Sequence, residues 1–195
     1  QSPDTLDFVS FLPPDSIRDT LITKADVLWD PSDPFPVAKH ATIGTGSLRR
    51  IDLLKDLRPD VQTVAIRGNI ETRMQHVLTG HLDAVILSEA GILRMGLPEG
   101  LHATPLDPHH FCPAPGQGVI VVQARRDCPL ARIAQHIGDP QQALISRFQM
   151  AIVAAIGFDC RDPFGLFSTT ENQHLNHHLA LVQGKQLRQI GRAHV

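Results

Sequence analysis

The stretch ATIGTGSLRR (residues 41–50) determines the fold class of this 195-residue chain. Its first three residues are typical of a short buried strand, and the two glycines at 44 and 46 frame a tight turn. Ser47 suits the N-cap of a helix with one apolar face, because leucine or isoleucine recurs at positions 48, 51, 54 and 57. A strand, a glycine turn and a helix in succession are the repeating unit of an α/β fold.

The same unit occurs twice more. Residues 61–66 predict a strand and residues 70–78 a helix with an apolar face. Residues 83–87 predict a third strand, and residues 88–95 a short helix that Gly96 ends. This alternation predicts a parallel sheet with helices on its faces.

A different pattern flanks these units. A strand is expected at residues 6–12, a connection between domains at 105–115, and another strand at 119–124. Asp139 as N-cap and Pro140 at the first helical position predict a long helix. Its expected buried stripe is Leu144, Phe148, Ile152 and Ile156. Short antiparallel strands at 164–170, 178–183 and 186–191 complete a small α+β unit.

Composition narrows the classes of function. The net charge of −2 gives no basic field for nucleic acid, and no apolar run approaches the ~20 residues of a membrane span. Fourteen arginines stand against four lysines, which indicates anion recognition or, with equal weight, genomic base composition. The three cysteines, Cys112, Cys128 and Cys160, suit free thiols in a reducing cytoplasm. His109, His110 and Cys112 lack the usual spacing of zinc ligands, so no metal is expected.

The turn at residues 44–50 is a candidate anion site, because backbone N–H groups at a helix N-terminus bind anions. No Walker lysine follows, and Arg49 stands where a dinucleotide-binding turn needs a small residue. Arg49 and Arg50 in the first helical turn oppose the helix dipole, which favours a ligand role. A capped helix with two solvated arginines explains the local pattern equally well.

A second candidate site follows the next strand. Arg67 lies at its carboxyl end, where α/β sheets bind ligands, Gly68 permits close approach, and Arg73 lies one turn into the helix. Arg94 ends the third helix, where a cation also stabilises the dipole. Three or more arginines at one sheet edge favour a polycarboxylate or phosphate ligand.

Two further segments are candidates for a role. PAPGQG (residues 113–118) reads best as a rigid crossover linker. Cys160, on a loop after the long helix, is the best candidate for a reactive thiol, with a buried inert thiol as the more frequent alternative.

Four segments together resemble the porphobilinogen deaminase (hydroxymethylbilane synthase) family in order and spacing. They are GTGSLRR (44–50), IRGNIETRM (66–74), DAVILSEAGILRMGL (83–97) and PAPGQG (113–118). The resemblance implies a transferase of porphyrin, heme and tetrapyrrole biosynthesis. Such an enzyme condenses four porphobilinogen units into a linear tetrapyrrole with release of ammonia, on a covalent dipyrromethane primer.

The resemblance also implies roles for individual residues. Cys160 would carry the dipyrromethane cofactor through a thioether. Cofactor-binding positions are matched by Ser47, Arg49, Arg50, Arg67 and Arg73, and substrate-binding positions by Arg94, Gly68 and Thr45. The catalytic Asp of the family, in a Lys-Asp-x-Pro motif, is not found in the chain, so no catalytic residue is assigned. Three departures stand out: Gly46 replaces a serine, Gln149-Met150-Ala151 replaces Glu-Arg-Ala, and residues 157–160 replace Glu-Gly-Gly-Cys.

The implied fold has two α/β domains like those of periplasmic solute receptors and a third, small α+β domain. We expect a remnant of domain one at residues 1–16, domain two at 17–108, a return into domain one at 109–137, and domain three at 138–195. Domain one is then incomplete, as in an N-terminally truncated or divergent member. A cytoplasmic monomer is expected, with porphobilinogen as its substrate and no nucleic acid or membrane partner. The alternative is a catalytically inactive module of the same fold that binds carboxylates or tetrapyrroles.

Overall fold

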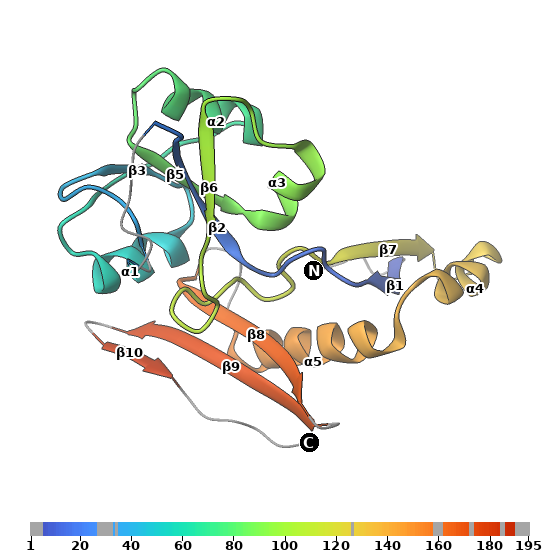
Figure 1. Cartoon of the computed structure of the whole chain (residues 1–195). Helices are drawn as coiled ribbons and strands as arrows, with labels where there is room; N and C mark the ends of the chain where they lie inside the picture. The colour runs from blue at the N-terminus through green and yellow to red at the C-terminus, as the bar shows by residue number, and fades with distance from the viewer. Residues whose placement is uncertain are drawn as a thin grey trace.

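The largest sheet of the computed structural model has five strands and lies in the upper left of Figure 1. The structure describes residues 6–26, 33, 35–125, 127–157, 162–171, 174–183 and 186–189. The strand order is β4-β3-β5-β2-β6. The bounds are Asp19–Lys24 for β2, Thr42–Gly44 for β3, Gln62–Val64 for β4, Ala84–Ser88 for β5 and Leu101–Pro105 for β6.

This sheet is mixed, so the expectation of a parallel sheet is only partly correct. Strand β3 runs parallel to β4 and β5, as the repeated units predict. Strand β2 runs antiparallel to both β5 and β6, and neither β2 nor β6 was expected. Their sequences, DTLITK and LHATP, show no clear alternation, because β2 is buried on both faces and β6 is short and ends in proline.

Helices cover both faces of the sheet. The predicted helices are confirmed as α1 (Leu48–Leu57), α2 (Ile70–Leu78) and α3 (Glu89–Met95). Leu53 and Leu54 of α1 pack with Ile86 of β5 on one face. Met74 and Val77 of α2 pack with Val85 of β5 on the other. Successive residues of β5 thus serve two apolar cores.

Two strands from distant parts of the chain form a separate sheet. β1 (Leu6–Leu12) pairs antiparallel with β7 (Ile120–Arg125), and α4 (Leu130–Ala134) and a 3-10 turn (Gln135–Ile137) follow. The chain therefore crosses between this pair and the five-stranded sheet twice, over residues 13–18 and 106–119. The pairing accords with the division in which 109–137 returns to the unit that contains 1–16, and that division stays a prediction.

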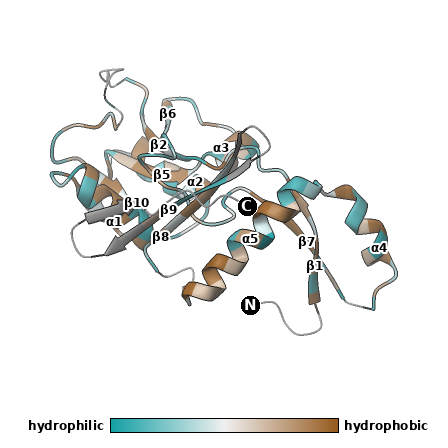
Figure 2. Cartoon of the chain, turned by 90° about the horizontal axis from the view of Figure 1, so that it is seen from below, coloured by the Kyte–Doolittle hydropathy of each residue, from teal (hydrophilic) through white to brown (hydrophobic). Residues whose placement is uncertain are grey.

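Helix α5 (Pro140–Ile156) begins as predicted, because the Asp139 carboxylate accepts a hydrogen bond from Gln142 N at 2.6 Å. Its predicted buried stripe is wrong at two of four positions, since Leu144 is 63% exposed and Ile156 is 38% exposed. The buried residues are Ser146 and Gln149 instead, while Phe148 and Ile152 are half-buried. Both buried residues of the helix are polar, and Figure 2 shows that α4 and α5 also carry apolar residues, of which Leu130, Ile133 and Leu144 are exposed.

The last sheet has the order β10-β9-β8, all antiparallel. Its strands are β8 (Phe164–Glu171), β9 (His174–Gln183) and β10 (Gln186–Gln189), with β9 starting four residues before the predicted position. Gly165 lies so close to Cys112 that an added Cβ would meet its sulfur at 2.8 Å. Within the described residues no helix has the length and apolarity needed to cross a membrane.

Candidate functional site

One buried carboxylate holds both arginines of the GTGSLRR turn. Arg49 and Arg50, in the first turn of α1, are 4% and 9% exposed, and Asp19 at the start of β2 is fully buried. Arg50 Nη2 and Nε donate to Asp19 Oδ1 at 2.7 and 3.1 Å. Arg49 Nη1 lies 2.8 Å from Asp19 Oδ2 as an ion pair. The two arginines are therefore neither solvated nor free.

The remaining donors of the pair reach backbone carbonyls and one amide side chain. Arg49 Nη1 donates to Cys112 O at 2.6 Å, and Arg50 Nη1 donates to Ile86 O at 2.9 Å. Arg49 Nη2 also donates to Gln117 Oε1 at 3.2 Å. The cluster thus joins β2, β5 and α1 to the second crossing, which is the segment of residues 106–119.

Gln117, in the middle of the PAPGQG segment, completes this cluster. Its Nε2 donates to Ile17 O at 2.8 Å and to Asp19 Oδ1 at 3.1 Å. The sequence predicted a rigid linker here and a match to a family segment, but no contact of Gln117, and it did not point to Asp19. The glycines and prolines around Gln117 were the one sequence signal that this segment has a structural role. Asp19 begins a strand that was not predicted, so no sequence signal pointed to it.

Positive charge exceeds negative charge at this cluster. Burial lowers the pKa of the Arg50 guanidinium, Asp19 opposes this, and the charges of Arg49 and Arg73 lower the pKa further. In the described part of the chain, Asp19 is the one carboxylate paired with any of these three arginines. Such an excess favours an additional anion.

The IRGN segment lies at the carboxyl end of β4, as predicted. Arg67 is exposed and forms no hydrogen bond or ion pair with the residues that the structure describes. Arg73 Nε donates to Gly68 O at 2.9 Å, and Gly68 has a φ of +110°, which favours glycine. The Asn69 side chain caps α2 by accepting from Thr72 N at 2.8 Å.

Backbone contacts fix the turn that precedes α1. Thr45 is 1% exposed, and its N–H donates to Val64 O at 2.9 Å. Ser47 occupies the N-cap position but forms no side-chain cap bond, while its N–H donates to Thr45 Oγ1 at 3.3 Å. A Cβ on Gly46 would lie 2.9 Å from Ile66 O, so this turn favours glycine at position 46.

Arg94 bridges the two crossings. Its Nε donates to Asp15 Oδ2 at 2.7 Å, and its Nη2 donates to Gly118 O at 3.1 Å. Its side chain is 39% exposed, and its substrate-binding role stays a prediction.

Cys160, the predicted attachment point, lies outside the described residues. Among the described thiols, Cys112 is buried and Cys128 is half-buried. Burial raises the pKa of Cys112 to about 12, although Arg49 opposes the shift, so this thiol is not a nucleophile near neutral pH.

His109 and the adjacent pair His177 and His178 contact aromatic rings. His177 stacks on Phe148 with 4.1 Å between centroids, and His178 stacks on Phe167 at 4.4 Å. His109 contacts the edge of the His178 ring at 4.8 Å. Among the described residues, no group of three or more histidine, cysteine, aspartate or glutamate side chains is placed to hold a metal ion.

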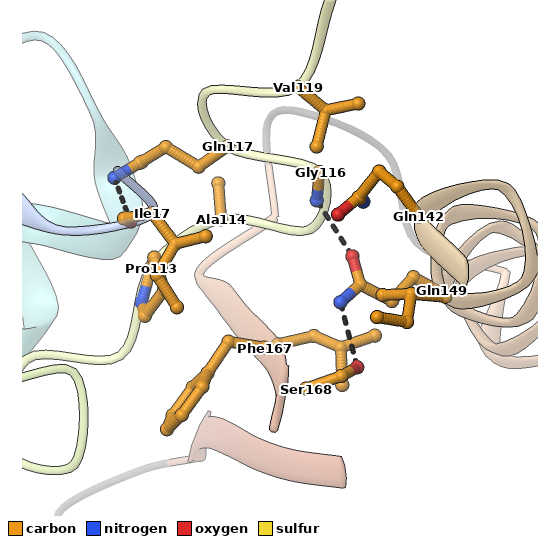
Figure 3. A pocket seen from close by; sticks show the side chains of 12 residues that line it. Ile17, Pro113, Ala114, Gly116, Gln117, Val119, Gln142, Gln149, Phe167 and Ser168 are labelled. Atoms are coloured by element: carbon orange, nitrogen blue, oxygen red, sulfur yellow. Dashed lines mark hydrogen bonds between the residues drawn. The ribbon is translucent and has the colours of Figure 1, made fainter. Parts of the chain in front are cut away.

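A cavity of about 40 Å³ lies between the PAPGQG segment, α5 and β8 (Figure 3). Gln149 Oε1 accepts from Gly116 N at 2.9 Å, and Gln149 Nε2 donates to Ser168 Oγ at 2.9 Å. Ser168 Oγ also lies 2.8 Å from His177 Nδ1, so a chain of hydrogen bonds runs from Gly116 through Gln149 and Ser168 to His177. The cavity has room for water but not for a pyrrole ring.

Known proteins resemble the chain over most of its length. The family model described as "Porphobilinogen deaminase, dipyromethane cofactor binding domain" matches residues 1–132. A "Probable porphobilinogen deaminase" of Ignicoccus hospitalis is 33% identical over 166 residues, covering 85% of this chain and 53% of that protein. The "Porphobilinogen deaminase" of Corynebacterium diphtheriae is 40% identical over 144 residues, covering 73% and 48%. The chain spans about half the length of these relatives.

Similarity to solved structures is weaker. A Salmonella typhimurium periplasmic binding protein with high arginine specificity is 15% identical, with a TM-score of 0.42, and the match covers 75% of this chain and 63% of that one. The Bordetella pertussis BvgS periplasmic VFT2 domain is 17% identical with a TM-score of 0.40, covering 77% and 65%. Such scores add nothing to the fold described above. The match of the family model to more than half of the residues shows that the chain belongs to the porphobilinogen deaminase family.

Proposed function

We propose that this chain binds the carboxylates of pyrroles as part of a hydroxymethylbilane synthase, the transferase that joins four porphobilinogen units and releases ammonia in porphyrin and heme biosynthesis. The observation that carries the proposal is the excess positive charge at the sheet edge. Arg49, Arg50 and Arg73 are balanced by Asp19 alone in the described chain. Arg67, exposed at the carboxyl end of β4, adds a further guanidinium.

The proposed ligand suits this arrangement. Each porphobilinogen ring carries two carboxylates, and guanidinium groups bind carboxylates with paired, charge-assisted hydrogen bonds. We assign the dipyrromethane carboxylates to Ser47, Arg49, Arg50, Arg67 and Arg73. Arg94, Gly68 and Thr45 are assigned to the substrate, with Gly68 and Thr45 acting through the turns that they shape.

The donor set fits the dipyrromethane cofactor, because its acidic side chains need several guanidinium groups close together. When bound through the Cys160 sulfur, that cofactor supplies the pyrrole carbon at which the tetrapyrrole grows. The arginines neutralise the carboxylates and fix the ring positions. A catalytic residue is not assigned.

The test compares the wild-type chain with Cys160→Ser, and uses Cys128→Ser as the matched control. Intact mass and the colour reaction of pyrroles with Ehrlich's reagent report the cofactor, and ammonia release reports turnover of porphobilinogen. The proposal expects a pyrrole adduct and ammonia release in the wild type and Cys128→Ser, both lost in Cys160→Ser. A purified, folded chain with only its polypeptide mass contradicts the cofactor assignment. Binding of porphobilinogen without ammonia release favours the inactive binding module.

The proposal also covers the location, the oligomeric state and the domain organisation of the chain. We infer a cytoplasmic monomer with domain one formed by residues 1–16 and 109–137, domain two by 17–108 and domain three by 138–195. The β1–β7 pairing supports the joining of the first two segments. Sedimentation equilibrium should return the mass of one chain, and a mass of two chains would contradict the monomer.

A further inference from the structure

We propose that Asp19 is a positioning residue that holds Arg49 and Arg50 in place for ligand carboxylates, and that Gln117 connects this clamp to the second crossing. The effect on ligand binding rests on the proposed function, whereas the clamp itself does not. Neither residue belongs to the arginine-rich motifs.

The need for Asp19 follows from the charges that it separates. Arg49 and Arg50 are adjacent in sequence, both are buried, and like charges at close range repel in a medium of low polarity. The Asp19 carboxylate uses one oxygen for each guanidinium, at 2.8 and 2.7 Å. Without this carboxylate the two charges would be buried and unopposed, which is strongly destabilising.

Asp19 is a permanent part of the site and not a competitor of the ligand. The residue is fully buried and paired with both guanidiniums, so a ligand as large as a pyrrole cannot take its place. After the bonds to Asp19, Cys112 and Gln117, Arg49 Nε has no hydrogen-bond partner among the described residues. The clamp therefore fixes the guanidinium groups without using every donor.

The clamp also lies where both crossings meet the sheet. Asp19 follows the first crossing directly, and its backbone carbonyl accepts from Leu106 N at 2.9 Å, at the start of the second. Gln117 in the second crossing binds Ile17 O and Asp19 Oδ1 (Figure 3 shows the bond to Ile17). The PAPGQG segment thereby gains a role beyond that of a linker, because it supports the arginine pair.

The test uses Asp19→Asn, which keeps the shape and removes the charge, and Asp52→Asn as the control on the exposed side of α1, where Asp52 pairs with Lys55. Calorimetry with porphobilinogen should show binding that is weaker by roughly ten-fold or more in Asp19→Asn, the scale of a lost buried charge contact. The control should bind as the wild type does. Equal or tighter binding by Asp19→Asn overturns the proposal, because it would mark Asp19 as a spectator or a competitor.

A rescue experiment separates positioning from general loss of structure. In Asp19→Ala, formate can enter the space of the missing carboxylate, so added formate should restore most of the affinity for porphobilinogen. In the wild type formate should only compete with the ligand. Failure of formate to restore binding in a folded Asp19→Ala chain contradicts the positioning role.

A ligand-free measurement keeps the clamp testable if the variants do not fold or the wild type does not bind porphobilinogen. Nitrogen-15 NMR of arginine side chains should show slow proton exchange at the Arg49 and Arg50 guanidiniums and fast exchange at Arg67. Fast exchange at all three overturns the clamp. Slow exchange together with absent porphobilinogen binding contradicts the proposed function and leaves the clamp supported.

Discussion

Arg67 differs from the other predicted ligand-binding arginines because its guanidinium is exposed and has no partner in the described chain. Arg67→Ala should therefore weaken porphobilinogen binding by about 1.5–3 kcal/mol, the scale of a hydrogen bond to a charged group, with little change in stability. Calorimetry beside urea unfolding measures both quantities. Arg132→Ala on α4 serves as the control for loss of one exposed positive charge. Unchanged affinity in Arg67→Ala places the ligand elsewhere.

His177 gives the fold a dependence on pH. Burial and then the neighbouring His178 lower the pKa of His177 below its ordinary value of 6.5. The unfolded chain therefore binds this proton more readily, and stability should fall as the pH is lowered from about 7.5 to about 5.5. His177→Gln should flatten this decline in urea-unfolding free energy, whereas exposed His102→Gln should keep it. An equal decline in both variants would show that His177 is not the cause.

The sequence named the candidate arginines, but it did not predict that Arg49 and Arg50 are buried. Positions 49, 50, 67 and 73 follow from motifs and from the rule that ligands bind at the carboxyl ends of strands. Burial of Arg49 depends on the carboxylate of Asp19, 30 positions earlier in the chain. A single aspartate in a segment with no predicted structure forms no sequence pattern. The role of Gln117 likewise depends on tertiary contacts.

At the scale of elements, local sequence signals predicted where helices begin, whereas tertiary contacts decide which face of a helix is buried. α2, α3 and α5 begin within one residue of their predicted starts, because caps and breakers act over a few residues. The apolar periodicity of α5 suggested an apolar buried face, yet Gln149 is buried and Leu144 is exposed. Gln149 accepts a hydrogen bond from Gly116 N and donates one to Ser168 Oγ, and these bonds fix the orientation of the helix. Apolar periodicity carries no information about them.

Gln149 therefore offers a test of how α5 is held. Gln149→Leu leaves Gly116 N–H and Ser168 Oγ without this partner, which should cost about 1–3 kcal/mol of unfolding free energy. Hydrogen exchange at the Gly116 amide should also accelerate. Gln75→Leu, an exposed exchange of the same kind on α2, should change neither quantity. Wild-type stability in Gln149→Leu would show that other contacts hold the helix.

At the scale of the whole molecule, the described residues form three sheets that meet at the two crossings. The α/β class and the antiparallel C-terminal sheet were predicted, because hydrophobic periodicity and turn residues report them. The antiparallel β2 and β6 were not, because pairing between distant short strands leaves no local pattern. The Asp19 clamp lies at the meeting point of the crossings, so the anion site depends on the arrangement of the sheets.

A crystal structure of the chain with bound porphobilinogen tests the central claim most directly, namely that the arginines at this sheet edge bind the carboxylates of a pyrrole. The account predicts ligand carboxylate oxygens within hydrogen-bond distance of Arg67 and Arg73, with Asp19 still bound to Arg49 and Arg50. Porphobilinogen bound elsewhere, with no contact to Arg67 or Arg73, would contradict it.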